Sequence, residues 1–145
     1  MSPQNSVCLF TEGQVTLPDG YQDRTVNAFI PPAAHAPALN IARDTLNPDE
    51  TLAAYIDRQL ALMEKHLKGW KQGLRDAATL GNNLLQGEIV HASYLRDGRR
   101  IWQQQAVFNS ADRQVLVFTM SSSAAFNDAD NALFLALLAS FHFHA

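Results

Sequence analysis

"NPDETLAAYIDRQLALMEKHLKG", residues 47–69, is the clearest secondary-structure signal in the sequence. Asn47 fits an N-cap, Pro48 fits the first helical position and Glu50 fits the third position of a capping box. Gly69 is typical of a helix C-cap. The apolar side chains recur at helical spacing and form one stripe: Leu52, Tyr55, Ile56, Leu60, Met63 and Leu67. We therefore predict one amphipathic helix between Asn47 and Gly69.

Segments that alternate like β-strands lie on both sides of this helix. Before it, we predict strands in Cys8–Leu17 (with a turn at Glu12-Gly13), Thr25–Ile30 and Ala38–Arg43. After it, we predict strands in Trp70–Ala77, Leu84–Leu95, Arg99–Phe108 and Gln114–Met120. Asp97-Gly98 fits the tight turn of a hairpin.

A second helix is predicted over Asn127–Phe141, near the end of the chain. This order of elements predicts an α+β fold in one domain, residues 1–145. The expected architecture is a curved antiparallel sheet of six or seven strands with two helices. Because the second helix is apolar almost all round, we expect it to be buried on more than one side.

Several of the predicted strands are apolar on both faces. In "QVLVFTM", Val115 and Val117 alternate with Leu116 and Phe118. Two helices can cover about one face of such a sheet, so the other face would need a second subunit or a bound partner. The alternative is that the strands curl into a half-barrel and fill their own interior. The pattern alone does not decide between these two.

Composition excludes several classes of protein. The chain has 145 residues, a net charge of −3 and no long basic run, which argues against nucleic-acid binding. Cys8 is the single cysteine, so an internal disulfide is impossible. "MSPQNSVCLF" lacks the features of a signal peptide, and the apolar run Ala132–Ala139 is too short to span a bilayer. We expect a cytosolic protein.

No group of residues forms a recognisable catalytic or metal-binding set. Ser121–Ser123 lack the glycines of a nucleophile elbow. His142 and His144 form a His-x-His pair at the end of the chain, where a solvated tail is the better interpretation. His91 stands alone in a strand, and Cys8 has no neighbours that would lower its pKa. We therefore expect no enzyme activity, no cofactor and no metal.

Small and amide side chains occur at unusual positions. Ala38, Asn40 and Ala42 share one face of a predicted strand, and Gln59 interrupts the apolar stripe of the first helix. Gln103–Gln105 place amides on both faces of another strand. Transmembrane helices pack against each other through such small and amide residues. The simpler interpretation is that the glutamines face solvent, which we expect for at least one of the three.

Four segments resemble a known family: "LPDGYQDRTVNAFIPP", "IARD", "YIDRQLALMEKHLKGW" and "YLRDGRRIWQQQAVF". They are similar to the DcrB-related domain with a Mog/PsbP-like fold, and within it to the Eag chaperones of type VI secretion. The resemblance runs from about Gly13 to about Ala139. It implies a cytoplasmic homodimer that holds the N-terminal transmembrane helices of a secreted effector. It also implies help in loading the effector's PAAR domain onto the VgrG spike.

The resemblance further implies a hydrophobic groove lined by strand residues and by one side of the first helix. By position, the groove residues would be Val26, Ala28, Ala38, Asn40, Ala42, Gln59, Met63, Leu67, Ile101 and Gln105. Ala28 and Asn40 depart from the larger apolar residues expected there, which would alter the width or the strength of the groove.

Two other functions stay open at this point. One is a ligand-binding or enzymatic domain that holds a metabolite in its concave sheet, which convergent titratable groups would support. The other is a scaffold adaptor that binds a folded protein through its polar surface.

Overall fold

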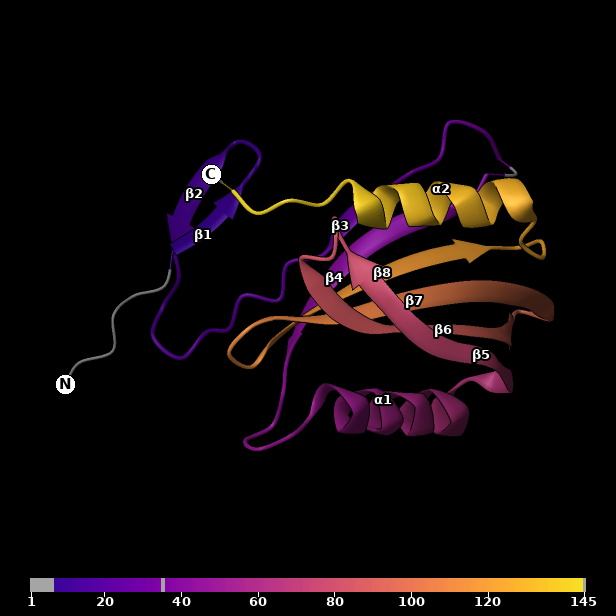
Figure 1. The fold of residues 1–145 in the computed structure, drawn as a ribbon, viewed down its shortest axis with the longest axis horizontal. Coiled ribbons are helices and arrows are strands. Elements are labelled where there is room, and N and C mark those ends of the chain that lie inside the picture. The colour runs from indigo at the N-terminus through magenta and orange to yellow at the C-terminus, as the bar shows by residue number, and fades with distance from the viewer. Residues whose placement is uncertain (1–6, 35, 145) are drawn as a thin grey trace.

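A six-stranded antiparallel sheet with a helix on each face forms the body of the protein (Figure 1). The computed structural model describes residues 7–34 and 36–144. The elements are β1 (Val7–Phe10), β2 (Gly13–Thr16), β3 (Asn27–Phe29), β4 (Ala38–Thr45), α1 (Leu52–His66), β5 (Lys68–Leu80), β6 (Leu85–Arg96), β7 (Arg99–Ala111), β8 (Gln114–Ser122) and α2 (Asp128–Ala139). The order in the sheet is β3-β4-β8-β7-β6-β5. The predicted α+β fold is confirmed.

The long β6–β7 hairpin forms as predicted, and β8 lies inside the sheet between β7 and β4. Asp97 and Gly98 have φ angles of 53° and 77°, which are the positive values that a two-residue hairpin turn requires. Strand β3 is shorter than the predicted Thr25–Ile30, because only Asn27–Phe29 pairs with β4.

Helix α1 begins and ends at other residues than the sequence predicted. Its N-cap is Thr51, whose side chain accepts a hydrogen bond from the Ala54 backbone N–H at 3.1 Å. Glu50 does accept a bond from the Asn47 N–H, at 2.9 Å, but in the turn that precedes the helix. The C-cap is Leu67, and Gly69, with φ 61°, belongs to a bulge of β5. The prediction of Asn47 and Gly69 as caps was wrong, because Asn47 belongs to the turn before the helix and Gly69 belongs to a bulge of β5.

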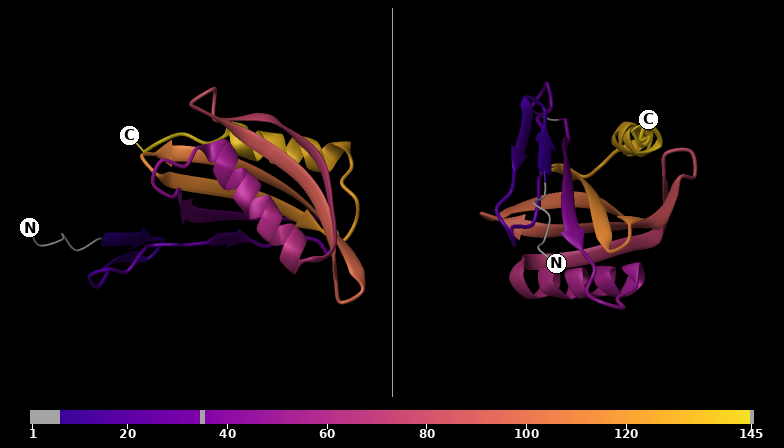
Figure 2. Two further views of the ribbon diagram at one scale, coloured as in Figure 1. Left: turned by 90° about the horizontal axis from the view of Figure 1, so that it is seen from below. Right: turned by 90° about the vertical axis from the view of Figure 1, so that its left-hand side faces the viewer.

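The two helices pack on opposite faces of the sheet (Figures 1 and 2), which corrects the expectation that they share one face. Tyr55, Ile56 and Leu60 of α1 form one core with the sheet, and Phe134 and Leu138 of α2 contribute to the other. The sheet residues of the α1-side core are Val90, Val107 and Val115, and those of the α2-side core include Leu80, Ala106, Phe108, Phe118 and Met120. One chain therefore supplies cover for both faces.

Helix α2 has a complete capping box at its N-terminus, but only one of its sides is buried. The Asn127 side chain and the Asp130 side chain bond to each other's backbone N–H groups in a capping box. Leu133 and Leu135 lie on opposite flanks of the buried side, and they are 44% and 61% exposed. The expectation that α2 is buried on more than one side is wrong for a single chain.

The β1–β2 hairpin extends beyond the main sheet (Figures 1 and 2). Its apolar side chains are largely exposed, including Leu9 at 70% and Val15 at 49%. Among the described residues, no helix is long and apolar enough to cross a membrane. Residues 1–6, which form much of the stretch examined for a signal peptide, lie outside the described residues.

Gly87 in β6 is required by close packing against β7. A Cβ atom added there would lie 2.6 Å from Cδ1 of Phe108 and would also clash with the Val107 carbonyl oxygen. We expect Gly87→Ala to lower the free energy of unfolding by about 1–3 kcal/mol, as overpacking does. Gly73→Ala is the control, because its nearest neighbour would be 3.6 Å away. Urea denaturation measures both, and equal stability of the two variants would contradict the prediction.

Candidate functional site

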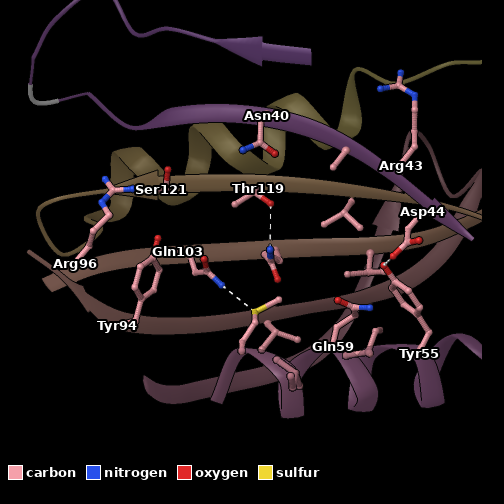
Figure 3. A pocket seen from close by; sticks show the side chains of 18 residues that line it. Asn40, Arg43, Asp44, Tyr55, Gln59, Tyr94, Arg96, Gln103, Thr119 and Ser121 are labelled. Carbon is pink, nitrogen blue, oxygen red and sulfur yellow. Dashed lines mark hydrogen bonds between the residues drawn. The ribbon is translucent and has the colours of Figure 1, made fainter. Parts of the chain in front are cut away.

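A groove lies on the α1 face of the sheet, between α1 and β4 (Figure 3). Its volume is about 470 Å³. Its floor comes from β6, β7 and β8, and its walls come from α1 and β4. The lining residues are Asn40, Ala42, Arg43, Asp44, Tyr55, Ile56, Gln59, Leu60, Met63, Val90, Tyr94, Arg96, Gln103, Gln105, Val107, Val117, Thr119 and Ser121.

The groove exists because α1 fills only part of the face on which it packs. The α1-side core includes Val107 of β7 and Val115 of β8. Farther along β8, the same face carries Thr119 and Ser121, and the facing residues of β4 are Asn40 and Ala38. Small and polar side chains at these positions leave the space beside α1 unfilled.

The three consecutive glutamines of β7 divide between the two faces of the sheet. Gln103 and Gln105 line the groove, where the Gln103 Nε2 lies 3.7 Å from the Met63 sulfur and the Gln105 Nε2 lies 3.4 Å from the Thr119 hydroxyl oxygen. Gln104 is on the opposite face and donates to the Asn131 Oδ1 of α2 at 2.6 Å. Since Gln103 and Gln104 are 8% and 3% exposed and Gln105 is half-buried, the expectation of a solvent-facing glutamine was wrong.

Several amides in the groove have unused hydrogen-bonding capacity. The side chains of Asn40 and Gln59 point into the groove from opposite walls (Figure 3). Within residues 7–34 and 36–144, neither side chain makes a hydrogen bond, and the contacts of Gln103 and Gln105 are long. Asn40 and Gln59 can therefore bond an occupant directly, and Gln103 and Gln105 would exchange only long contacts for such bonds.

One end of the groove is closed by a polar network. The Tyr55 hydroxyl donates to Asp44 Oδ2 at 2.7 Å, and Arg24 forms an ion pair with the same carboxylate at 3.0 Å. Burial, together with this hydrogen bond, raises the pKa of the Tyr55 phenol well above its usual value, so Tyr55 keeps its proton at neutral pH and donates it in the hydrogen bond to Asp44. Arg43 donates to the Thr25 carbonyl at 2.9 Å and to Asn27 Oδ1 at 2.7 Å, which fixes β3 beside β4.

The other end of the groove is open and continues into a second cavity. Tyr94, Arg96 and Ser121 stand at this end, opposite to Asp44 and Tyr55 (Figure 3). The second cavity shares Arg96 and Ser121 with the groove, and its lining is Pro31, Ala34, Ala36, Ala38, Arg96, Ile101, Ser121, Ser122 and Ser123. Small side chains therefore continue past the end of the groove.

The structure brings most of the predicted site residues to this region. Five of them line the groove: Asn40, Ala42, Gln59, Met63 and Gln105. Ala38 and Ile101 line the second cavity. Ala28 pairs with Asn40 and so shares its face, but Ala28 and Val26 are exposed on the edge strand rather than in the groove. Leu67 is the C-cap of α1 and does not line the groove.

Sequence reasoning missed part of the groove floor. Gln103 was not predicted, although it shares a strand face with Ile101 and Gln105, and that alternation could have identified it. Thr119 and Ser121 were missed because the predicted strand over Gln114–Met120 was treated as apolar on both faces. The described residues contain no group of three or more His, Cys, Asp or Glu side chains placed to hold a metal ion.

The DcrB family model matches residues 12–140 of this chain. The chain belongs to the DcrB family. A relative named Effector EagT6, from Pseudomonas aeruginosa PAO1, is 31% identical to this DcrB-family chain over 118 residues, which cover 79% of each protein. These two matches confirm the family resemblance found in the sequence.

Comparison with solved structures supports the fold of the DcrB-family chain. A protein of unknown function from Pseudomonas aeruginosa, PA94, described as a putative regulator, superimposes with a TM-score of 0.78. The two are 22% identical, and the match covers 99% of each chain. LpqN of Mycobacterium tuberculosis, described as involved in cell envelope biogenesis, is a distant match, with a TM-score of 0.41 and 16% identity over 83% of each chain.

Two neighbouring glutamines of this DcrB-family chain provide a matched test of which amides stabilise the fold. Gln104→Ala removes a short, buried hydrogen bond to α2, so we expect the free energy of unfolding to fall by about 1–3 kcal/mol. Gln105→Ala removes only a long contact in an open groove, and we expect a loss below about 1 kcal/mol. Chemical denaturation of both variants checks this. A larger loss for Gln105→Ala would show that the groove amides hold the fold together.

Proposed function

We propose that this chain is a cytoplasmic chaperone of type VI secretion, which binds the N-terminal transmembrane helices of a PAAR-containing effector and helps to load it onto the VgrG spike. The observation that carries the proposal is the groove beside α1. It combines apolar walls, small residues and amides without strong internal partners. Membership of the DcrB family and the similarity to EagT6 support the same role.

The chemistry of the groove suits a helix that would otherwise be exposed to water. Apolar surface in water costs about 25 cal/mol per Å², so a transmembrane helix in the cytoplasm needs cover. Ala42 and Met63, both half-buried, offer apolar contact. Small residues allow a helix to approach closely, and amides can meet polar groups of that helix, as occurs between helices in membranes.

The length of the groove sets how much of a helix it can cover. From Val90 to Arg96, both of which line it, an extended strand spans roughly 20 Å. At 1.5 Å per residue, that length covers about 13 helical residues, whereas a helix needs about 20 residues to span a membrane. The rest of the client helix would continue over the second cavity, or it would be covered by a second copy of the chain.

Binding of a small molecule is the second candidate function. The groove volume of about 470 Å³ lies within the range of small-molecule sites. Its charged groups do not converge on one point, however, because Asp44 is paired with Arg24 at one end and Arg96 lies at the other (Figure 3). Native mass spectrometry of the purified protein would detect a tightly retained metabolite. We therefore propose a binding role without catalysis.

The chaperone proposal is tested by a substitution that places a charge in the groove without changing the shape of the side chain. Gln59→Glu is isosteric, and the client helix would have to bury the new carboxylate without a partner, which costs several kcal/mol. The chain is co-expressed with the N-terminal region of the effector encoded beside it. We expect Gln59→Glu to reduce the recovered soluble effector at least about tenfold.

Gln86→Glu is the matched control, because Gln86 is exposed on β6 and does not line the groove. Thermal melts of both variants check that each is folded. Full retention of the effector by a folded Gln59→Glu variant would place client binding outside the groove. Failure of the wild-type chain to keep the effector soluble would overturn the chaperone role itself.

We also propose that the chain functions as a homodimer that buries the flank of α2 on which Leu135 lies. Leu135 is 61% exposed there, and it adjoins a cavity of about 290 Å³ lined by Ala77, Ala78, Thr79, Gly81, Ile89, Leu135, Leu138 and Ala139. An apolar helix side next to an apolar hollow is typical of a surface that binds another protein. A second copy would bury both.

Leu135→Glu tests the dimer, because a two-fold interface would bury the new carboxylate of both subunits and so be destabilised twice. We expect this variant to sediment as a monomer at a concentration at which the wild type is dimeric. Leu62→Glu on the outer side of α1, where Leu62 is 44% exposed, is the control and should remain dimeric. Dissociation by Leu62→Glu alone would assign the interface to α1 instead.

A further inference from the structure

Two arginines face each other across the β6–β7 hairpin at the open end of the groove. Arg96 pairs with Arg99 in the strand register, next to the pair formed by Tyr94 and Ile101. Directly opposed residues of antiparallel strands point to the same face of the sheet, so both arginines lie on the face of Tyr94, which is the groove face. Arg96 lines both the groove and the second cavity.

These two positive charges have no counter-ion among residues 7–34 and 36–144. Both side chains are exposed, and like charges directly opposite each other in a sheet are destabilising, so a bound anion would relieve their repulsion. Three other arginines form ion pairs: Arg24 pairs with Asp44, Arg58 with Glu50, and Arg75 with Asp57 and Glu88. Arg43 and Arg100 donate to oxygen acceptors in the sheet. Arg96 and Arg99 have neither an ion pair nor a hydrogen bond of this kind.

The opposite end of the groove differs in its electrostatics. There Asp44 accepts from Tyr55 and pairs with Arg24 at 3.0 Å. Arg43, which also lines the groove, shares a neighbouring cavity with Asp23, so two carboxylates stand beside two arginines at this end. The groove is therefore neutral at the Asp44 end and positive at the Arg96 end. An occupant that extends along it meets the two exposed arginines, Arg96 and Arg99, at one end only.

We propose that Arg96 and Arg99 bind an acidic side chain that follows the C-terminal end of the client helix. This inference rests on the proposed function, because it assigns the orientation of the helix in the same groove. A carboxylate supplies the full negative charge that the pair lacks, and guanidinium groups bind carboxylates with paired hydrogen bonds. The C-terminal end of a helix also carries a partial negative charge, so this orientation adds both attractions at one site.

The test uses three probes fused to a soluble carrier, each an apolar Leu/Ala helix of about 20 residues. The first has Glu after the last helical residue, the second has Gln at that position, and the third has Glu before the first helical residue. Affinity for the full-length wild-type chain is measured at low and at high salt. We expect the first probe to bind about fivefold more tightly than the other two, with the difference reduced in about 1 M salt.

Charge reversal gives the second arm of the experiment. The double variant Arg96→Glu and Arg99→Glu should lose the preference for the first probe and should favour a probe with Lys at that position. Arg113→Glu is the matched control, because Arg113 lies in the β7–β8 turn, outside the groove lining, and also lacks an ion pair within the described residues. We expect this control to bind the probes as the wild type does.

The outcomes separate this inference from the function on which it rests. Equal binding of the Glu and Gln probes by the wild type would overturn the role of Arg96 and Arg99 and leave the helix-binding groove standing. Preference for the third probe would overturn the proposed orientation. If no probe bound the wild type at all, the groove function would fail, and the orientation would fail with it.

Discussion

Strands β7 and β8 carry apolar side chains on both of their faces, and both faces must be kept from water. Phe108 and Phe118 point to one side, where α2 covers them, and Val107 and Val115 point to the other, where α1 does. Helix α1 follows β4, the second strand from one edge of the sheet, and helix α2 follows β8. This two-sided requirement explains why the sheet has a helix on each face and why neither helix can cover a face completely.

The groove is the part of the α1 face that this cover does not reach. Where α1 packs closely, the sheet presents valines, and where the groove opens, it presents Asn40, Gln103 and Thr119. Polar groups in an apolar surface cost stability unless they are bonded. In the proposed function these side chains would contact the client helix, and the internal contacts of Gln103 and Gln105 are long.

The exposed apolar surfaces of the single chain belong to different elements and need not serve the same purpose. The flank of α2 on which Leu135 lies adjoins a hollow over β5, whereas the groove lies on the other side of the sheet. A chaperone that covers a helix longer than its own groove would gain from a second copy, because two grooves cover more apolar length than one. The proposed dimer and the proposed client site therefore complement each other without competing for surface.

Much of the fold was predictable from the sequence, because hydrophobic periodicity and turn residues act locally. Local patterns predict the two helices and the β6–β7 hairpin at Asp97-Gly98. They also predict the small-polar-small face of β4. The helix caps were not predictable in the same way: Asn47 and Gly69 have suitable side chains or backbone freedom, but Asn47 belongs to the turn before the helix and Gly69 to a bulge of β5.

The sequence by itself determined which side chains share a face of each strand, and the tertiary structure alone decided what covers that face. Alternation separates Gln104 from Gln103 and Gln105, yet only the packing of α2 shows that Gln104 bonds to Asn131 while the other two line the groove. Likewise, the charges of Arg96 and Arg99 are plain in the sequence, but only the structure shows that neither forms an ion pair with another described residue. Contacts of this kind join residues far apart in the chain, and local patterns carry no information about them.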